Sequence, residues 1–107
     1  MRLELKILPQ VVREIDDEPI ELKQSVFGTL ERAGRGESIG MPLCRPLFSI
    51  VKGLYELRFS YRAGEYRVFY YVKLGQAIYV IHSMRKKSQK LEQRTIDLLI
   101  SRIRRLP

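Results

Sequence analysis

The sequence predicts an α+β domain, in which an N-terminal strand and two helices precede a three-stranded antiparallel meander and a C-terminal helix. Three observations predict this class. Alternating apolar residues mark strands in residues 2–8 and 53–85, apolar residues at helical spacing mark the segments between and after them, and no repeat or linker divides the chain. With 107 residues the chain can build one core but not two. We therefore expect a single domain spanning residues 1–107.

The first part of the chain predicts one strand and two helices. Residues 2–8 (RLELKIL) alternate leucine and isoleucine with charged side chains, as a half-buried strand does. Pro9 ends this strand and suits the first turn of a helix over PQVVREID. Pro19 opens a second helix, PIELKQSVFGTLERAG, which Gly34 ends. Gly28 lies inside it and costs up to about 1 kcal/mol relative to alanine.

The remaining elements are a loop, the meander and a last helix. Residues 35–47 contain two glycines and two prolines and have no period, which predicts a long connecting loop. A hairpin is expected over residues 53–72 and a third strand over QAIYVIHSMR, with Gly75 in the turn between them. The segment SQKLEQRTIDLLISRIRRLP carries a helical apolar stripe. We expect the helices to cover one face of the sheet and leave the other partly open to solvent.

Two arginines stand in the middle of the predicted hairpin. Side chains alternate along a strand, so Leu57 and Phe59 share one face while Arg58 lies on the other, and Arg67 falls on that same second face. A central arginine on the core face would need a buried carboxylate, and none is evident nearby. We therefore expect both arginines to project from the helix-free face, where their mutual repulsion costs some tenths of a kcal/mol (~0.5) unless an anion bridges them.

Positive charge is concentrated in the second part of the chain. Residues 1–44 hold 6 basic and 8 acidic side chains, whereas residues 45–107 hold 14 basic and 4 acidic ones, for a net charge of +8. This segregation favours a polyanionic partner, although a soluble basic protein with solvated lysines has the same composition.

Aromatic rings accompany this charge in the predicted sheet. Cations beside rings are typical of single-stranded nucleic-acid binding, while packing in the core is the competing interpretation for each tyrosine. The rings are Tyr55, Tyr61, Phe69, Tyr71 and Tyr79.

Several classes of protein are disfavoured. The only cysteine, Cys44, rules out an internal disulfide, fits a reducing compartment, and lies in a proline-flanked loop that is a poor setting for a nucleophile. No apolar run approaches the roughly 20 residues of a membrane span, and the N-terminus lacks the features of a signal peptide. We expect a cytoplasmic protein without a metal or cofactor.

Three runs in order carry a resemblance to a known family. The runs KGLYELRF (52–59), EYRVFYYV (65–72) and IHSMRKKSQK (81–90), with the closing helix, resemble the RelE/HigB superfamily of toxins from type II toxin–antitoxin systems, most closely its phage-derived toxin-like branch. The resemblance covers nearly the whole chain and implies a RelE-like fold. It implies a ribosome-dependent endoribonuclease, an mRNA interferase, that cleaves mRNA on the ribosome by attack of a 2′-hydroxyl on the adjacent phosphate. It also implies a cognate antitoxin, a HigA-like helix-turn-helix protein.

The resemblance also implies roles for particular residues. Arg67 is assigned to the scissile phosphate, Arg58 to the phosphate or the proton relay, and Lys87 with its neighbour Lys86 to the transition state. An arginine with a pKa above ~12 is a poor base, so the two lysines are better candidates for that task. His82 is either an acid–base group or a hydrogen-bonded structural histidine, and its parity with Val80 directs it toward the core.

The sequence departs from the family pattern at two points. Glu56 stands where some RelE toxins have a basic residue, and residues 88–107 contain no tyrosine to serve as acid or base. The alternative hypotheses are a ParE-like gyrase inhibitor of the same fold and a general RNA-binding module. The expected RNA-binding residues are Arg85, Lys90, Tyr71 and Lys52.

Overall fold

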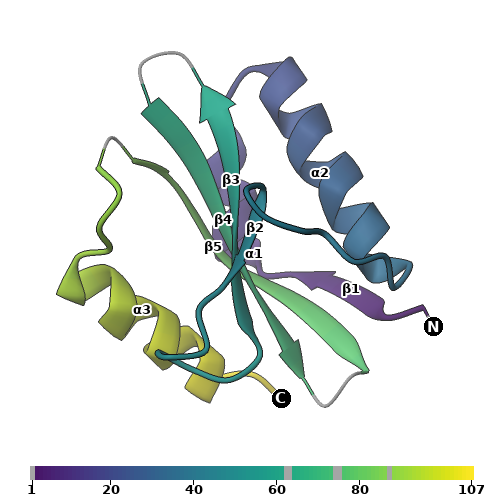
Figure 1. Ribbon diagram of the computed structural model, residues 1–107, viewed down its shortest axis with the longest axis vertical. Helices are drawn as coiled ribbons and strands as arrows, with labels where there is room; N and C mark the ends of the chain where they lie inside the picture. The colour runs from purple at the N-terminus through teal and green to yellow at the C-terminus, as the bar shows by residue number, and fades with distance from the viewer. Residues whose placement is uncertain (1, 62–63, 74–75, 87) are drawn as a thin grey trace.

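The computed structural model describes residues 2–61, 64–73, 76–86 and 88–107, which form three helices and a five-stranded mixed sheet (Figure 1). The predicted α+β class is confirmed. The elements are β1 (Glu4–Ile7), α1 (Pro9–Ile15), α2 (Ile20–Gly34), β2 (Cys44–Pro46), β3 (Leu54–Tyr61), β4 (Gly64–Lys73), β5 (Ala77–Lys86) and α3 (Gln93–Arg104).

The strands lie in the order β1–β5–β4–β3–β2. β1 pairs parallel with β5, and the other neighbouring strands pair antiparallel. The prediction of a structureless loop over residues 35–47 is wrong at Cys44–Pro46, which forms β2 and pairs with Tyr55–Leu57 of β3. Three residues are too few to show a strand period, and their partner fixes them instead. The turn expected at Gly75 lies outside the described residues.

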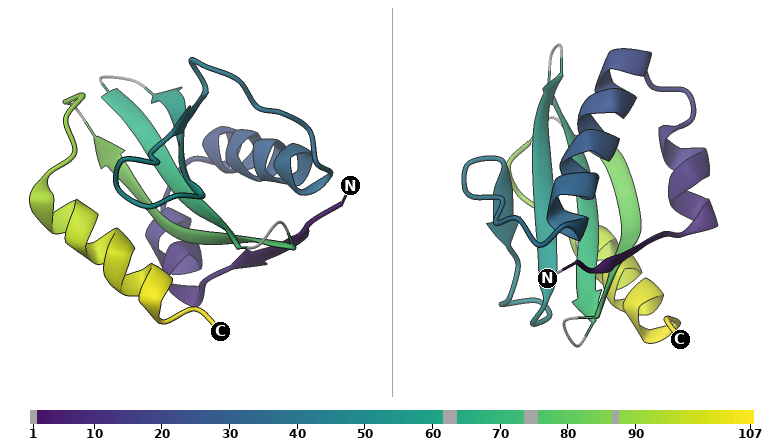
Figure 2. Two further views of the ribbon diagram at one scale, coloured as in Figure 1. Left: turned by 60° about the horizontal axis from the view of Figure 1, so that its bottom comes forward. Right: turned by 90° about the vertical axis from the view of Figure 1, so that its right-hand side faces the viewer.

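Helices cover both faces of the sheet (Figures 1 and 2). α1 and α2 pack on the face that contains Leu57 and Val68. α3 packs on the opposite face, where Leu99 is fully buried against a cluster that includes Phe69 and Ile81. The expectation of one helix-free face is therefore wrong, because the apolar stripe of α3 is buried against the second face rather than beside α1 and α2.

The predicted alternation within the hairpin is confirmed. Leu57 and Phe59 belong to the α1 and α2 side of the core, and Phe69 belongs to the α3 side. Arg58 and Arg67 lie directly opposite each other across the β3–β4 pair. The two arginines therefore share the face that α3 partly covers.

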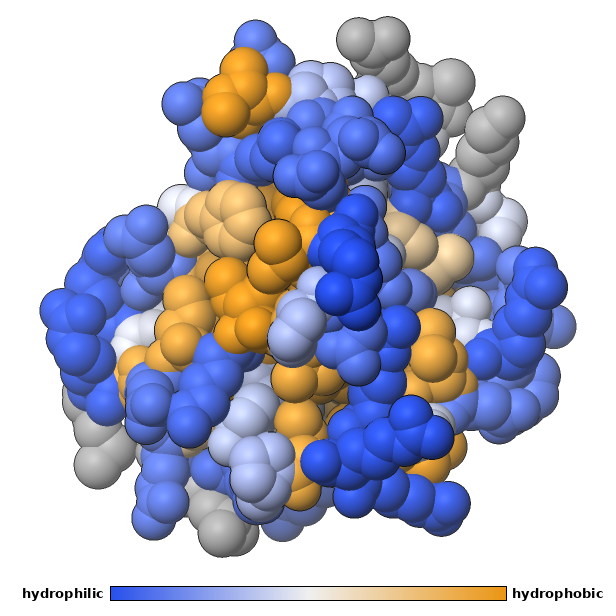
Figure 3. All heavy atoms as spheres, turned by 180° about the vertical axis from the view of Figure 1, so that it is seen from behind, coloured by the Kyte–Doolittle hydropathy of each residue, from blue (hydrophilic) through white to orange (hydrophobic). Residues whose placement is uncertain are grey.

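The side of the molecule that faces away from the viewer in Figure 1 has an apolar centre. Figure 3 shows hydrophobic residues gathered in the middle of this face and hydrophilic residues around them. α1 and α2 contribute two of the large exposed apolar side chains, Val12 and Ile20. Among the described residues, no helix has both the length and the apolar character needed to cross a membrane.

Two glycines predict opposite effects of the same substitution. α2 runs unbroken through Gly28, where an added Cβ would meet no heavy atom within 4 Å, so Gly28→Ala should stabilise the protein by about 0.5–1 kcal/mol. Gly53 has φ +94° and its Cβ would lie 3.0 Å from the carbonyl oxygen of Val72, so Gly53→Ala should destabilise it by about 1–3 kcal/mol. Urea unfolding of both variants checks this, and equal signs would contradict it.

Candidate functional site

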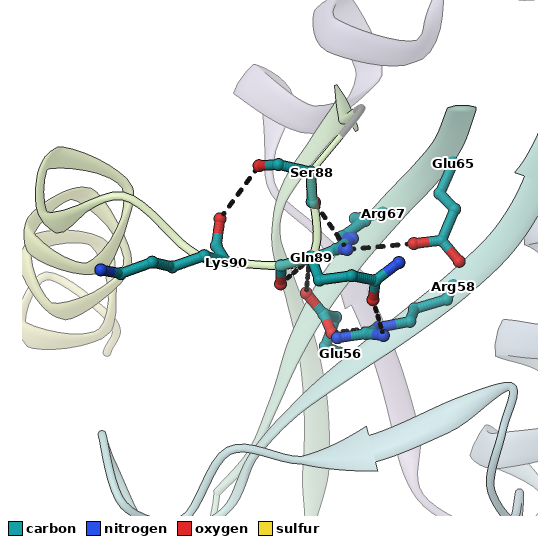
Figure 4. Close-up of polar contacts among 7 residues, drawn as sticks. All are labelled: Glu56, Arg58, Glu65, Arg67, Ser88, Gln89 and Lys90. Carbon is teal, nitrogen blue, oxygen red and sulfur yellow. Dashed lines mark hydrogen bonds and ion pairs between the residues drawn. The ribbon is translucent and has the colours of Figure 1, made fainter. Parts of the chain in front are cut away.

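The carboxylate of Glu56 joins the two hairpin arginines. Its Oε2 accepts a hydrogen bond of 3.0 Å from Nη1 of Arg67, and its Oε1 accepts one of 2.7 Å from Nε of Arg58. The side chains of Glu56 and Arg67 are 1% and 0% exposed, and that of Arg58 is 12% exposed. The cluster is thus an interior Arg–Glu–Arg arrangement on the sheet (Figure 4).

The terminal N–H groups of Arg67 also donate hydrogen bonds to other internal acceptors. Nη2 donates to Oε1 of Glu65 and to the carbonyl oxygen of Ser88, both at 3.0 Å, and Nη1 also donates to the carbonyl oxygen of Gln89 at 3.3 Å. Its Nε is buried and has no hydrogen-bond partner among the described residues. A phosphate therefore cannot contact Arg67 unless these groups move.

This geometry corrects the expectation for Arg58 and Arg67. Both lie on the predicted face, but they do not project into solvent, and a buried carboxylate that was not foreseen lies between them. Glu56 and Glu65 offset the charges of the two arginines. The physical reason is that the face is covered, and a covered guanidinium needs an ionic partner.

The same cluster holds the segment that follows β5. Nη1 of Arg58 donates to the side-chain Oε1 of Gln89 at 2.8 Å, in addition to the bonds from Arg67 to the carbonyl oxygens of Ser88 and Gln89. Figure 4 shows the side chain of Lys90 extending away from the cluster towards α3. We name the cluster of Glu56, Arg58, Arg67 and Gln89 the Glu56 hub.

The described basic residues near the end of β5, Arg85 and Lys86, do not lie on one face. Lys86 is buried and lies opposite Glu65 in the β4–β5 pair, and Lys87 lies outside the described residues. Arg85 is exposed and pairs with Glu18 at 2.9 Å, and this hydrogen bond raises the pKa of Arg85. Arg85, one of the expected RNA-binding residues, does not share the face of Arg58 and Arg67, because alternation places it beside Tyr66 on the α1 and α2 side.

Tyr71 and Lys52 lie toward the other end of the hairpin. Tyr71 is opposite Leu54 at the start of β3, four residues from Arg67 along β4, which is about 13 Å at the usual rise of a strand. Tyr71 packs against the apolar cluster under α3, and Lys52 is exposed. Neither belongs to the Glu56 hub.

His82 is interior, as its parity with Val80 predicts, but it lies on the other face of the sheet. A register shift between Phe69 and Tyr70 pairs His82 with Phe69 and Val80 with Tyr70, so His82 and Val80 do not share a face. The ring stacks on Phe69 with centroids 5.8 Å apart, and Nδ1 lies 2.9 Å from Oε2 of Glu14. His82 is therefore a hydrogen-bonded interior histidine, reached on the α3 side of the sheet.

Glu14 links three elements in a polar cluster that sequence reasoning missed. It accepts the amide hydrogen of Ser83 in β5 and a 3.0 Å bond from Nη1 of Arg102 in α3, which also donates to the carbonyl oxygen of Ile81. β1 pairs with β5 only at Ala77–Val80. Beyond Val80, the Glu14 side chain accepts the backbone amide hydrogen of Ser83. Burial raises the pKa of Glu14, but the bonds from His82 and Ser83 and the Arg102 charge outweigh it, and the net pKa is below its ordinary 4.5.

The described residues were also compared with the side-chain groups that bind metals. In the described part of the chain, no group of three or more histidine, cysteine, aspartate or glutamate side chains could hold a metal ion.

Comparison with known proteins identifies the family. The family model described as phage derived protein Gp49-like (DUF891) matches residues 13–104. The chain belongs to this Gp49-like family. The family is associated with RelE-like toxins of toxin–antitoxin systems. No curated protein matches the chain.

The Glu56 hub predicts a large energetic effect of Arg67. Arg67→Met should lower the free energy of unfolding by about 3–5 kcal/mol, because it removes a buried ionic partner and leaves two backbone carbonyls unsatisfied. Glu56→Leu/Arg67→Met should lose less than the sum of the two single variants. Chemical denaturation measures both.

The matched control for the hub is Arg94→Ala. Arg94 is 86% exposed, its ion pair with Glu92 spans 3.8 Å, and its loss should cost less than about 1 kcal/mol. Additive losses in the hub cycle would contradict the coupling. Because Arg67 stabilises the fold, the activity of an Arg67 variant must be compared together with its free energy of unfolding.

The Glu14 cluster predicts an acid-dependent stability. Its lowered folded pKa means that ionised Glu14 stabilises the fold above the unfolded pKa, and that this contribution disappears as the pH falls through the folded value. Glu14→Gln should therefore cost about 1–3 kcal/mol at neutral pH and progressively less on acidification. Denaturation from neutral pH to about pH 3 checks this. The exposed Glu31→Gln is the control, and a difference that grows in acid would refute the assignment.

Proposed function

We propose that this protein is the toxin of a type II toxin–antitoxin module and that it acts as a ribosome-dependent endoribonuclease on mRNA. The Gp49-like family match supports the toxin assignment. The observation that carries the proposal further is the hub itself, which fastens the basic segment after β5 beside Arg58. The cleavage would proceed by attack of a 2′-hydroxyl on the adjacent phosphate, giving a cyclic phosphate and a free 5′-hydroxyl.

The contacts of the hub suggest different roles for the candidate residues. Arg67 acts as a positioning residue, since internal acceptors occupy its terminal donors. Arg58 is partly exposed, and within the described residues its Nη2 has no hydrogen-bond partner, so it can offer a donor to the charge that develops on the phosphorane. The proton transfers are assigned to Lys86 or Lys87, because an arginine keeps its proton and is a poor base.

The remaining candidates have supporting parts in this proposal. Lys90 is exposed and follows the hub directly, so it is suited to holding RNA. Tyr71 and Lys52 would contact RNA farther along the hairpin, and Arg85, which is exposed and paired with Glu18, would do so from the opposite face of the sheet. The partners proposed are the translating ribosome and an antitoxin with a HigA-like helix-turn-helix domain, which would cover the basic surface or dock elsewhere and keep the toxin off the ribosome.

A second function is favoured by the neutralised arginines. In the described arrangement, the carboxylates of Glu56 and Glu65 offset the charges of Arg58 and Arg67. These two arginines therefore do not form an open pair of guanidinium groups for a phosphate. This favours a toxin of the same fold that blocks its target without cutting RNA, such as a gyrase inhibitor or an RNA-binding module. The two functions differ in a direct assay of message integrity.

Arg58 gives the sharper test, because Arg58→Ala leaves Glu56 paired with Arg67. We expect the wild-type protein to cleave mRNA in a translating extract and Arg58→Ala to reduce cleavage by about 100-fold or more, the usual cost of losing a transition-state donor. Lys6→Ala, on the far edge strand β1, is the charge-matched control and should cleave normally. Cleavage is measured by primer extension, with melting curves for all variants.

One outcome tests the role of Arg58, and two others distinguish the proposed functions. Full cleavage by a folded Arg58→Ala variant would contradict the assignment of that residue. Growth arrest by the wild-type protein with intact message and altered DNA supercoiling would favour gyrase inhibition, and arrest with RNA binding but no cleavage would favour the binding module.

A further inference from the structure

A basic hollow lies at the far end of α3, away from the Glu56 hub. A hollow of about 420 Å³ opens between α1 and the end of α3, and three arginines line it: Arg13, Arg102 and Arg105. Figure 2 shows α1 and the C-terminal part of α3 side by side, and the bond between Glu14 and Arg102 joins them. Because α3 begins just after the hub and has 12 residues, the hollow is about 18 Å along the helix from it.

The charges around this hollow are not balanced. Arg13 and Arg105 are exposed, and no described residue forms an ion pair or hydrogen bond with either guanidinium group. Arg102 uses Nη1 on Glu14 and on the carbonyl oxygen of Ile81, and Glu14 is already shared with His82. Two positive charges therefore remain uncompensated beside a third that is only partly offset, which is the reverse of the situation in the hub.

The walls of the hollow are apolar. Leu8 and Pro9, at the junction of β1 and α1, and Leu106, just after α3, form much of its apolar lining, and Gln10 and Pro107 complete it. A concave site with mostly apolar walls and a few charged groups is the usual form of a pocket for a small organic ligand, and the volume falls within the range of such pockets. Guanidinium forks match the oxygens of a phosphate group in number and geometry.

We propose that this hollow binds a phosphate group carried by a nucleotide, with the phosphate between Arg13 and Arg105 and the base or sugar against Leu8, Pro9 and Leu106. The nucleotide is either free or the end or a splayed unit of an RNA strand, and both sources present the same chemistry. Arg102 contributes the N–H groups that Glu14 and Ile81 leave unused. This site does not depend on the proposed cleavage activity, and it would exist equally in a non-nucleolytic toxin.

The test compares two double variants of the full chain. Arg13→Ala/Arg105→Ala removes the uncompensated cations of the hollow, and Arg94→Ala/Arg104→Ala removes the same charge from other exposed positions on α3. Arg102 is left in place because it also holds Glu14. Each protein is titrated with inorganic phosphate, uridine 5′-monophosphate and a ten-nucleotide RNA at constant ionic strength, and binding is followed by calorimetry and by amide NMR shifts.

We expect uridine monophosphate to shift amides of residues 8–13 and 102–106 and to bind at least about tenfold more weakly to the Arg13→Ala/Arg105→Ala variant, since a charge-assisted hydrogen bond is worth about that factor. The control variant should bind as the wild-type protein does. Shifts of the same amides by the RNA alone would assign the site to a strand rather than a free nucleotide. Equal weakening in both variants, or no amide shift with any probe, would overturn the proposal.

Discussion

The buried carboxylate of Glu56 is the constraint on which the rest of this arrangement depends. β3 and β4 place Arg58 and Arg67 directly opposite each other, and two guanidinium groups so close beneath a covering segment would repel unless an anion lay between them. Glu56 supplies that anion from within β3, two residues from Arg58. Once it is there, the arginines have donors left for the backbone after β5, and the path of the chain into α3 is fixed by them.

Interior neutralisation changes what the hub can contribute to function. A guanidinium that is 0% exposed and bonded to four internal oxygens acts on a substrate only through the parts that it holds in place. Arg67 therefore governs where the segment 88–90 lies, and Arg58, at the border of the hub, is the member that a ligand can reach. The chemistry of any reaction here would rest on groups around Arg67 rather than on Arg67 itself.

Periodicity predicted most of the fold, and the failures have physical causes. Alternation correctly assigns Leu57 and Phe59 to one face, and helical spacing predicts the apolar stripe of α3, but a stripe does not determine which face of the sheet it covers. The extra residue in β5 reverses parity at His82, and no local sequence signal marks a bulge of this kind. Parity places Glu56 on the face of Arg58, but its role as a buried ionic partner follows only from the burial of that face.

In this molecule, the residues that attract a polyanion are different from the residues that shape the Glu56 hub. Of the four acidic residues in the segment 45–107, Glu56 and Glu65 are engaged with Arg58 and Arg67, so the hub adds little to the positive field of this segment. The field that draws a polyanion must come from exposed cations outside the hub, and field strength falls with salt while a buried pair is little screened. Encounter with a nucleic acid and the shape of the surface it meets are thus set by different residues, and they should respond differently to ionic strength. The exposed cations outside the hub in this segment include Arg45, Lys52, Lys90, Arg94, Arg104 and Arg105.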